Sequence, residues 1–115
     1  MAAQTRSEVS GQTIRWVFED GPTKGMAFEH EFGRDGSVRY RMAGDGEAKG
    51  AKKGTGEVAK YGSARISDDV SVVSYRSANG FTLTVALNFA EHTAVGFASN
   101  SDQWFEQRGT FEVVD

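Results

Sequence analysis

The chain has 115 residues, contains no cysteine and carries a formal net charge of −3. Its length fits one domain, and the lack of cysteine excludes disulfide bonds, thiol catalysis and thiolate metal sites. The acidic balance argues against a nucleic-acid partner, and no apolar run is long enough to cross a membrane. Because the start of the chain is polar, unlike a secretory signal, we expect a cytoplasmic protein with neither a nucleic-acid nor a membrane partner.

Short segments with alternating apolar and polar residues, separated by Gly, Asn or Asp turns, run along the chain. The first expected strand, 13–19, places Ile14, Trp16 and Phe18 on one face, and a tight turn at 33–36 follows the second, 26–32. Further strands are expected at 37–42, 57–66, 70–76, 81–89, 93–99 and 110–114. About eight antiparallel strands predict an all-β fold, a single up-and-down barrel spanning 11–115. The interior of such a barrel is filled by side chains or holds one small ligand.

Several segments depart from this pattern. Residues 1–10 offer little to bury, and we expect them to be flexible. The Gly-rich stretch 43–56 contains Lys49, Lys52 and Lys53, with Lys60 just beyond it. We interpret it as a solvated loop, with a polyanion site as the alternative. Residues 101–107 fit one helical turn, and Gly62 suggests a bulge or a barrel corner.

His30 is the most informative polar residue of the sequence. It shares an alternating face with Met26, Phe28 and Phe32, which turns it toward the barrel interior. An imidazole in that position can serve as acid, base or ligand partner, and the alternative is a buried structural histidine. His92 is expected in a solvated turn. Two histidines without a third ligand at suitable spacing give no metal signature, and no cofactor motif is present.

Arg39 and Arg41 lie on the strand face opposite Val38, Tyr40 and Met42. If that apolar set faces the interior, both arginines lie on the surface and contribute little energy. If the opposite face of the strand points inward, both arginines can bind a carboxylate inside the barrel. The pattern leaves these two possibilities open.

Interior-facing aromatic residues together with His30 form the candidate ligand site. In a hollow barrel they would wall a pocket, and in a filled one they would form the core. The expected ligand-binding residues are Trp16, Phe18, Phe28, His30, Tyr40 and Tyr75.

Several strings of the sequence resemble the MoaF family. They are 11–22 (GQTIRWVFEDGP), 28–30 (FEH), 35–38 (DGSV), 75–85 (YRSANGFTLTV) and 107–113 (QRGTFEV). The resemblance covers nearly the whole chain from Gly11 onward. It implies a small barrel of the calycin type, in a family named after a protein linked to molybdenum-cofactor biosynthesis.

The chain is more distantly similar to phenolic acid decarboxylases, which are also small calycin barrels. Those enzymes use two tyrosines of the first strand, an arginine of the third and a glutamate near the fifth. The matching positions here are Trp16 and Phe18 for the tyrosines, Arg41 for the arginine and Asp68 for the glutamate. The two phenol hydroxyls of that site are therefore missing.

Three hypotheses follow. The first is a calycin-like barrel that binds a small, partly apolar ligand, aromatic or carboxylic, in its interior. The second is a lyase or isomerase that uses the same cavity, with His30 as general acid–base and Arg41 as anion clamp. The third is a homodimer or partner-binding module that acts through an exposed apolar patch around Trp104 and Phe105.

Overall fold

The computed structural model describes residues 8–21, 23–44 and 56–114, and within these ranges it contains eight β-strands and no helix. The strands are β1 (Thr13–Phe18), β2 (Ala27–Phe32), β3 (Ser37–Gly44), β4 (Glu57–Arg65), β5 (Val70–Arg76), β6 (Thr82–Asn88), β7 (Thr93–Ser99) and β8 (Trp104–Val113). The described part of the chain thus holds no helix of the length and apolarity that crossing a membrane requires.

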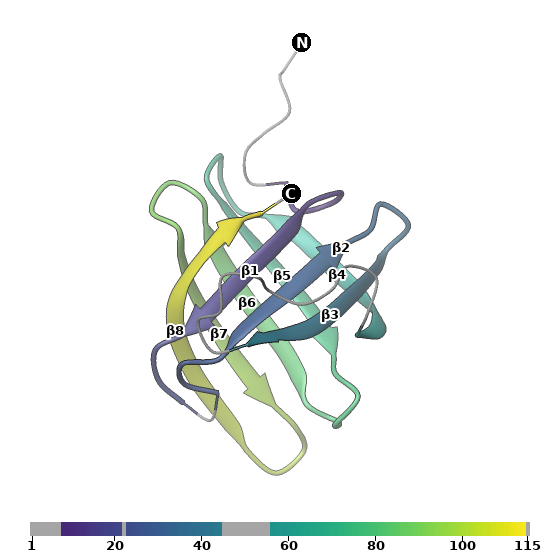
Figure 1. Ribbon diagram of the computed structural model, residues 1–115, viewed down its shortest axis with the longest axis vertical. Coiled ribbons are helices and arrows are strands. Elements are labelled where there is room, and N and C mark those ends of the chain that lie inside the picture. Colours follow the sequence, from purple (N-terminus) through teal and green to yellow (C-terminus); the bar gives the residue numbers. More distant parts are fainter. Residues whose placement is uncertain (1–7, 22, 45–55, 115) are drawn as a thin grey trace.

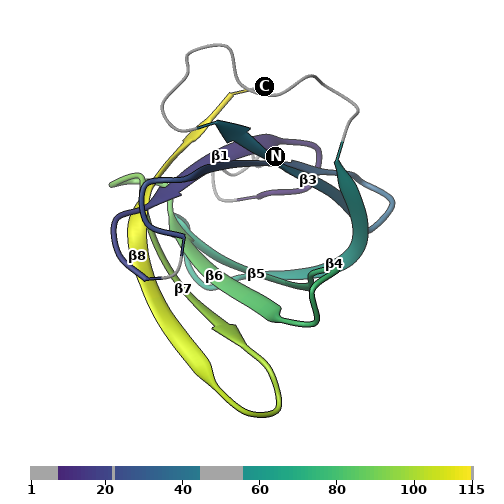
Figure 2. The same cartoon turned by 60° about the horizontal axis from the view of Figure 1, so that its bottom comes forward.

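Every strand pairs antiparallel with the next along the chain, and β1 also pairs with β8, which closes the sheet into a barrel (Figure 1). In Figure 2 the strands form a ring around the barrel axis. The predicted all-β, up-and-down barrel of eight strands is confirmed. Because side chains alternate across a strand, every second residue points into the barrel.

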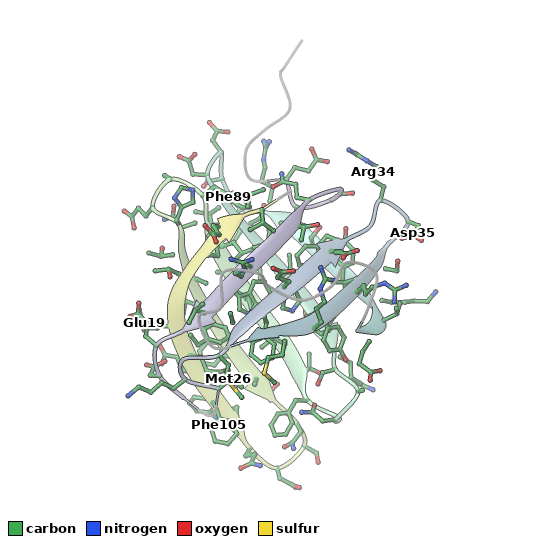
Figure 3. All side chains as sticks on the ribbon, viewed as in Figure 1. Glu19, Met26, Arg34, Asp35, Phe89 and Phe105 are labelled. Carbon is green, nitrogen blue, oxygen red and sulfur yellow. The ribbon has the colours of Figure 1, made fainter. Side chains whose placement is uncertain are left out.

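The barrel interior holds one cluster of buried apolar residues. Every strand except β4 contributes to it, and β1, β5 and β6 contribute more than one residue each. The buried cluster consists of Val9, Ile14, Trp16, Phe18, Phe32, Val38, Val73, Tyr75, Val85, Leu87, Phe89, Ala94 and Phe111. In Figure 3, Phe89 lies near one end of the barrel, whereas Met26 and Phe105 lie near the other.

Val9 corrects one detail of the expected flexible segment 1–10. Its side chain is only 2% exposed and belongs to the core cluster. A turn holds it there, because the Gln12 amide donates to the Val9 carbonyl and the Gly11 amide donates to the Phe32 carbonyl. Residues 1–7 lie outside the described residues.

Two further expectations about the strands need correction. The segment 101–107 does not form a helical turn, since β8 already begins at Trp104 and pairs with β7. Gly62 marks no bulge, because it pairs with Ser74 in an unbroken β4–β5 register; the alternative of a barrel corner at Gly62 stays a prediction. The register shift is found instead between Ala27 and Phe28, in the β2–β3 pair. Lys49, Lys52 and Lys53 of the Gly-rich stretch lie outside the described residues.

Candidate ligand-binding cavity

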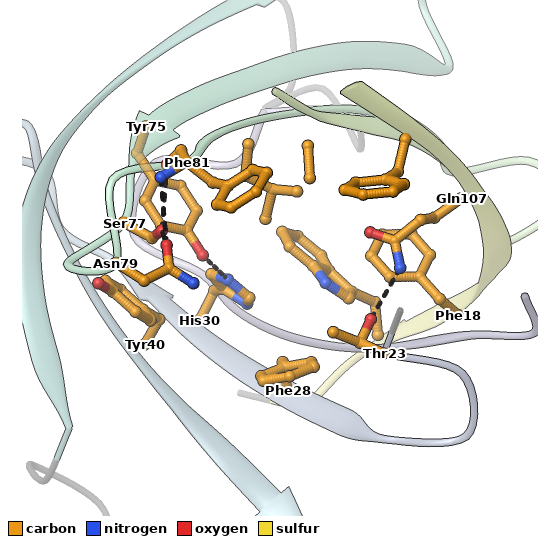
Figure 4. A pocket seen from close by; sticks show the side chains of 14 residues that line it. Phe18, Thr23, Phe28, His30, Tyr40, Tyr75, Ser77, Asn79, Phe81 and Gln107 are labelled. Carbon is orange, nitrogen blue, oxygen red and sulfur yellow. Dashed lines mark hydrogen bonds between the residues drawn. The ribbon is translucent and has the colours of Figure 1, made fainter. Parts of the chain in front are cut away.

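A cavity of about 250 Å³ occupies the end of the barrel opposite Phe89 (Figure 4). It lies among strands β1, β2, β3, β5, β6, β7 and β8, and the β1–β2 and β5–β6 connections border it. Its lining is mostly aromatic and aliphatic: Trp16, Phe18, Thr23, Phe28, His30, Tyr40, Tyr75, Ser77, Asn79, Phe81, Leu83, Ala98, Phe105 and Gln107. A second pocket, of about 350 Å³, is polar and lies beside Val9, among Glu8, Ser63, Ala64, Arg65 and Ser71. The aromatic-walled cavity is the apolar one of the two.

His30 lies at the cavity wall on β2. Its ring stacks on Trp16 with a centroid distance of 3.8 Å, and its Nε2 forms a 2.7 Å hydrogen bond with the Tyr75 hydroxyl. Within the described residues its Nδ1 is buried without a hydrogen-bond partner. Burial, and secondarily the positive charge of Arg41, lower the pKa of His30 from 6.5 to about 3. The imidazole is therefore neutral at physiological pH.

Tyr75 and Tyr40 continue this polar wall from β5 and β3. Their rings lie 4.9 Å apart, and the Tyr40 hydroxyl accepts a 2.8 Å hydrogen bond from the Ala78 amide in the β5–β6 turn. Burial, and then the neighbouring Tyr40, raise the pKa of Tyr75 above its usual range. Tyr75 thus keeps its proton, and the His30–Tyr75 pair is a hydrogen-bonding group without charge.

Gln107, on β8, forms a second polar position in the cavity wall. It lies across the cavity from His30 and Tyr75 (Figure 4). Its side-chain Nε2 donates to the Thr23 hydroxyl at 2.9 Å and to the Asp20 carbonyl at 3.5 Å. These bonds attach the β1–β2 connection to β8. A Cβ atom at Gly21, which has a φ of +83°, would approach Gln107 Cγ to 2.7 Å, so this connection packs closely on the glutamine.

Both arginines of β3 lie on the strand face opposite the cavity-lining Tyr40, and neither lines the cavity. Arg41 Nη2 forms an ion pair with Glu29 at 3.0 Å, and its Nη1 pairs with Glu31. Glu29 also pairs with Arg15 at 2.7 Å, which gives a charged cluster on the outer face of β1–β3. The alternative in which Arg39 and Arg41 point into the barrel is therefore wrong. Arg41 is not placed to bind an anion inside the cavity.

All six residues expected to bind a ligand lie on the cavity wall, namely Trp16, Phe18, Phe28, His30, Tyr40 and Tyr75. Their binding role stays a prediction. Sequence reasoning missed Gln107 and Ala98, which are interior residues of β8 and β7, and the turn residues Ser77 and Asn79. Alternation could have placed Ala98 opposite Phe97, but nothing in the sequence distinguished Gln107 from a surface glutamine.

The expected apolar surface patch has a different composition. Phe105 lines the cavity, whereas Trp104 is 65% exposed and packs edge-to-face on Phe97, itself 43% exposed. Among the described residues, no group of three or more His, Asp or Glu side chains is placed to hold a metal ion.

This arrangement defines the chain as a closed eight-stranded barrel with a cavity open at one end. The sequence matches no protein-family model and no curated protein. A crystal structure from Burkholderia vietnamiensis, named a "putative beta-lactamase", is similar to it with a TM-score of 0.70. The two share 21% sequence identity, over 96% of this chain and 100% of the other. At that identity the likeness concerns the fold alone, and this sequence contains no Ser-x-x-Lys motif of the class A β-lactamases.

Proposed function

We propose that this protein binds a small, uncharged, ring-shaped molecule inside the barrel. The observation that carries the proposal is the cavity of about 250 Å³ with aromatic walls and the His30–Tyr75 hydrogen-bonding pair. A dry cavity of about 150 Å³ is known to take up benzene. The space is thus suited to a single aromatic ring with substituents, and smaller than the usual site of a drug-sized ligand.

The lack of charge on the cavity wall selects for a neutral ligand. None of its lining residues carries an ionised side chain, because His30 is neutral and Arg41 lies outside the barrel. A carboxylate that entered would lose hydration without gaining a counter-charge, which is strongly unfavourable in an apolar site. This favours an aromatic ligand over the carboxylic ligand that the sequence also allowed.

The His30–Tyr75 pair can donate a hydrogen bond to a ligand or accept one from it. When Nε2 of His30 holds the proton, it donates to Tyr75, and the tyrosine hydroxyl can donate to a ligand. When Nδ1 holds it, Tyr75 donates to Nε2, and its oxygen can accept from a ligand. The pair can therefore bind a carbonyl, an ether or a hydroxyl group without a change of charge.

An enzyme that uses His30 as general acid–base has less support. A group of this kind works best with a pKa near the operating pH, whereas the pKa of His30 is lowered to about 3. The surface module also has less support, because the exposed apolar pair Phe97 and Trp104 is small beside the cavity.

Calorimetric or fluorescence-monitored melting with benzamide and benzoate tests the proposed function. The Ala98→Phe variant fills the cavity, and Ala86→Phe is its matched control on β6, since Ala86 alternates with the buried Val85 and Leu87 and faces outward. We expect benzamide at tenfold excess over Kd to stabilise wild type and Ala86→Phe by about 1.4 kcal/mol. Ala98→Phe should show no shift, and benzoate should shift none of the three. An equal benzamide shift in Ala98→Phe, or no shift in wild type, would contradict the proposal.

A further inference from the structure

The side chain of Gln107 carries a polar atom that the fold does not use. Gln107 is 3% exposed, and the hydrogen bonds that its side chain makes within the described residues both come from Nε2. Its carbonyl Oε1 therefore has no hydrogen-bond partner there. Oε1 is not one of the polar atoms sealed in the interior without a partner, so it stays accessible at the cavity wall and can accept a hydrogen bond from a molecule bound there.

The orientation of this amide is determined by its neighbours. Thr23 can donate or accept through its hydroxyl, but the Asp20 carbonyl can only accept. Nε2 must therefore face Asp20 and Thr23, as the two hydrogen bonds show. Oε1 is left on the other side of the amide, and in Figure 4 the Gln107 side chain reaches into the cavity. The cavity thus presents a fixed acceptor at this wall.

The opposite wall has a different character. The His30–Tyr75 pair reverses its hydrogen bond with the tautomer of His30, so it can meet a donor or an acceptor. Aromatic and aliphatic side chains, among them Trp16, Phe28 and Leu83, line the space between the two polar positions. A bound ring therefore needs a hydrogen-bond donor at the edge near Gln107, whereas the edge near His30 and Tyr75 can carry a donor or an acceptor.

We infer that the ligand carries an O–H or N–H donor at the end near Gln107 and a hydrogen-bond donor or acceptor at the end near His30 and Tyr75. This inference rests on the proposed function and names the ligand class more closely: a neutral aromatic ring with polar groups on opposite edges, at least one of them a donor. Phenols and aryl amines or amides with a second polar substituent belong to this class, whereas ring diethers do not.

Two probes of nearly the same size and shape test whether tight binding requires a hydrogen-bond donor on the ligand. 4-Methoxyphenol has one O–H donor, and 1,4-dimethoxybenzene has none. We expect wild type to bind 4-methoxyphenol about tenfold more tightly, as measured by protein-observed NMR titration, because only this probe satisfies the Gln107 acceptor. Gln107→Met, which keeps the length of the side chain without an acceptor, should reduce the ratio to about one.

Gln103→Met is the matched control, because Gln103 is exposed, lies outside the cavity and makes its hydrogen bonds to Asn100 through its backbone. The ratio in Gln103→Met should equal that of wild type. Equal binding of both probes to wild type, or an unchanged ratio in Gln107→Met, would overturn the inference while leaving the proposed function intact. If Gln107→Met fails to fold, the wild-type and Gln103→Met ratios still decide. Failure of wild type to bind either probe, together with benzamide, would overturn the proposed function itself.

Discussion

The ring of His30 lies between two aromatic residues, stacked on Trp16 and hydrogen-bonded to Tyr75. Its environment selects the neutral form, since burial and the nearby Arg41 charge both oppose protonation and lower the pKa to about 3. In the unfolded chain the same imidazole titrates near 6.5. Folding is therefore coupled to the loss of a proton from His30 whenever the pH lies between these two values.

The pH dependence of stability follows with a definite sign. The folded pKa of His30 is depressed, so the contribution of this group is complete above pH 6.5 and declines as the pH falls toward 3. Between pH 8 and pH 5 we expect wild type to lose about 2 kcal/mol of unfolding free energy through His30 alone. Denaturant unfolding at both pH values measures this loss.

His30→Phe is the reference for that measurement, because it keeps a ring against Trp16 but cannot titrate. Carboxylates elsewhere contribute equally to both proteins, so the difference between their pH dependences isolates His30. A variant that loses as much stability as wild type between pH 8 and pH 5 would show that His30 accepts a proton readily in the folded state.

The cavity-lining residues divide into those that the sequence could reveal and those that it could not. Trp16, Phe28 and His30 were placed inside because alternation with large apolar neighbours determines a strand face. Gln107 was not, because a polar residue on an interior face breaks the same pattern. For Arg41 the alternation was visible, but an arginine buried against Glu29 cannot be distinguished by sequence from one inside the barrel.

At the scale of elements, β8 is the strand that the sequence predicted least well. Its interior face consists of Phe105, Gln107, Gly109 and Phe111, so two of four positions lack a large apolar side chain. Apolar alternation therefore became visible only near the end of the strand, at 110–114. The strands with an unbroken apolar face, β1 and β6, were located within a residue or two.

Gly109 determines how closely β8 can approach β1, where the barrel closes. A Cβ atom on Gly109 would overlap the carbonyl oxygen of Val17 and lie 2.8 Å from the Cα atom of Phe18. Because both obstacles are backbone atoms, a side-chain rotation cannot relieve them. We expect Gly109→Ala to lower the unfolding free energy by about 3 kcal/mol, as measured by denaturant unfolding.

Gly62→Ala is the control for this substitution. Gly62 also lies within a strand, but a Cβ there would meet nothing within 4 Å. Its stability should stay within about 0.5 kcal/mol of wild type. Similar effects of the two substitutions would mean that the close contact at the β1–β8 junction does not limit the fold.

At the scale of the whole molecule, the barrel combines an aromatic-walled cavity with a polar pocket beside Val9. Val9, from the segment before β1, belongs to the core cluster together with Phe89 and Phe111. The expectation of a flexible start failed here because one apolar residue in a polar segment gives no periodic signal. Whether a barrel interior is filled depends on side-chain volumes in three dimensions, which alternation along single strands does not report.

The stability of the core cluster should depend on Val9. Val9→Ala removes two buried methyl groups, and we expect it to lower the unfolding free energy by about 2 kcal/mol. Val113→Ala is the matched substitution at a valine that is 44% exposed, and it should have an effect below about 0.5 kcal/mol. Equal effects in urea unfolding would contradict the assignment of Val9 to the core.

The aromatic-walled cavity can be observed directly through Trp16, which lines it and is one of only two tryptophans in the sequence. In the Trp104→Phe variant, Trp16 is the sole tryptophan, so its fluorescence reports on the cavity alone. Titration of this variant with benzamide and with benzoate is the most direct test of a neutral ligand inside the barrel. We expect a saturable change with benzamide and only the linear effect of collisions with benzoate. A linear response to both compounds, or a saturable response to benzoate of equal affinity, would contradict the proposed site.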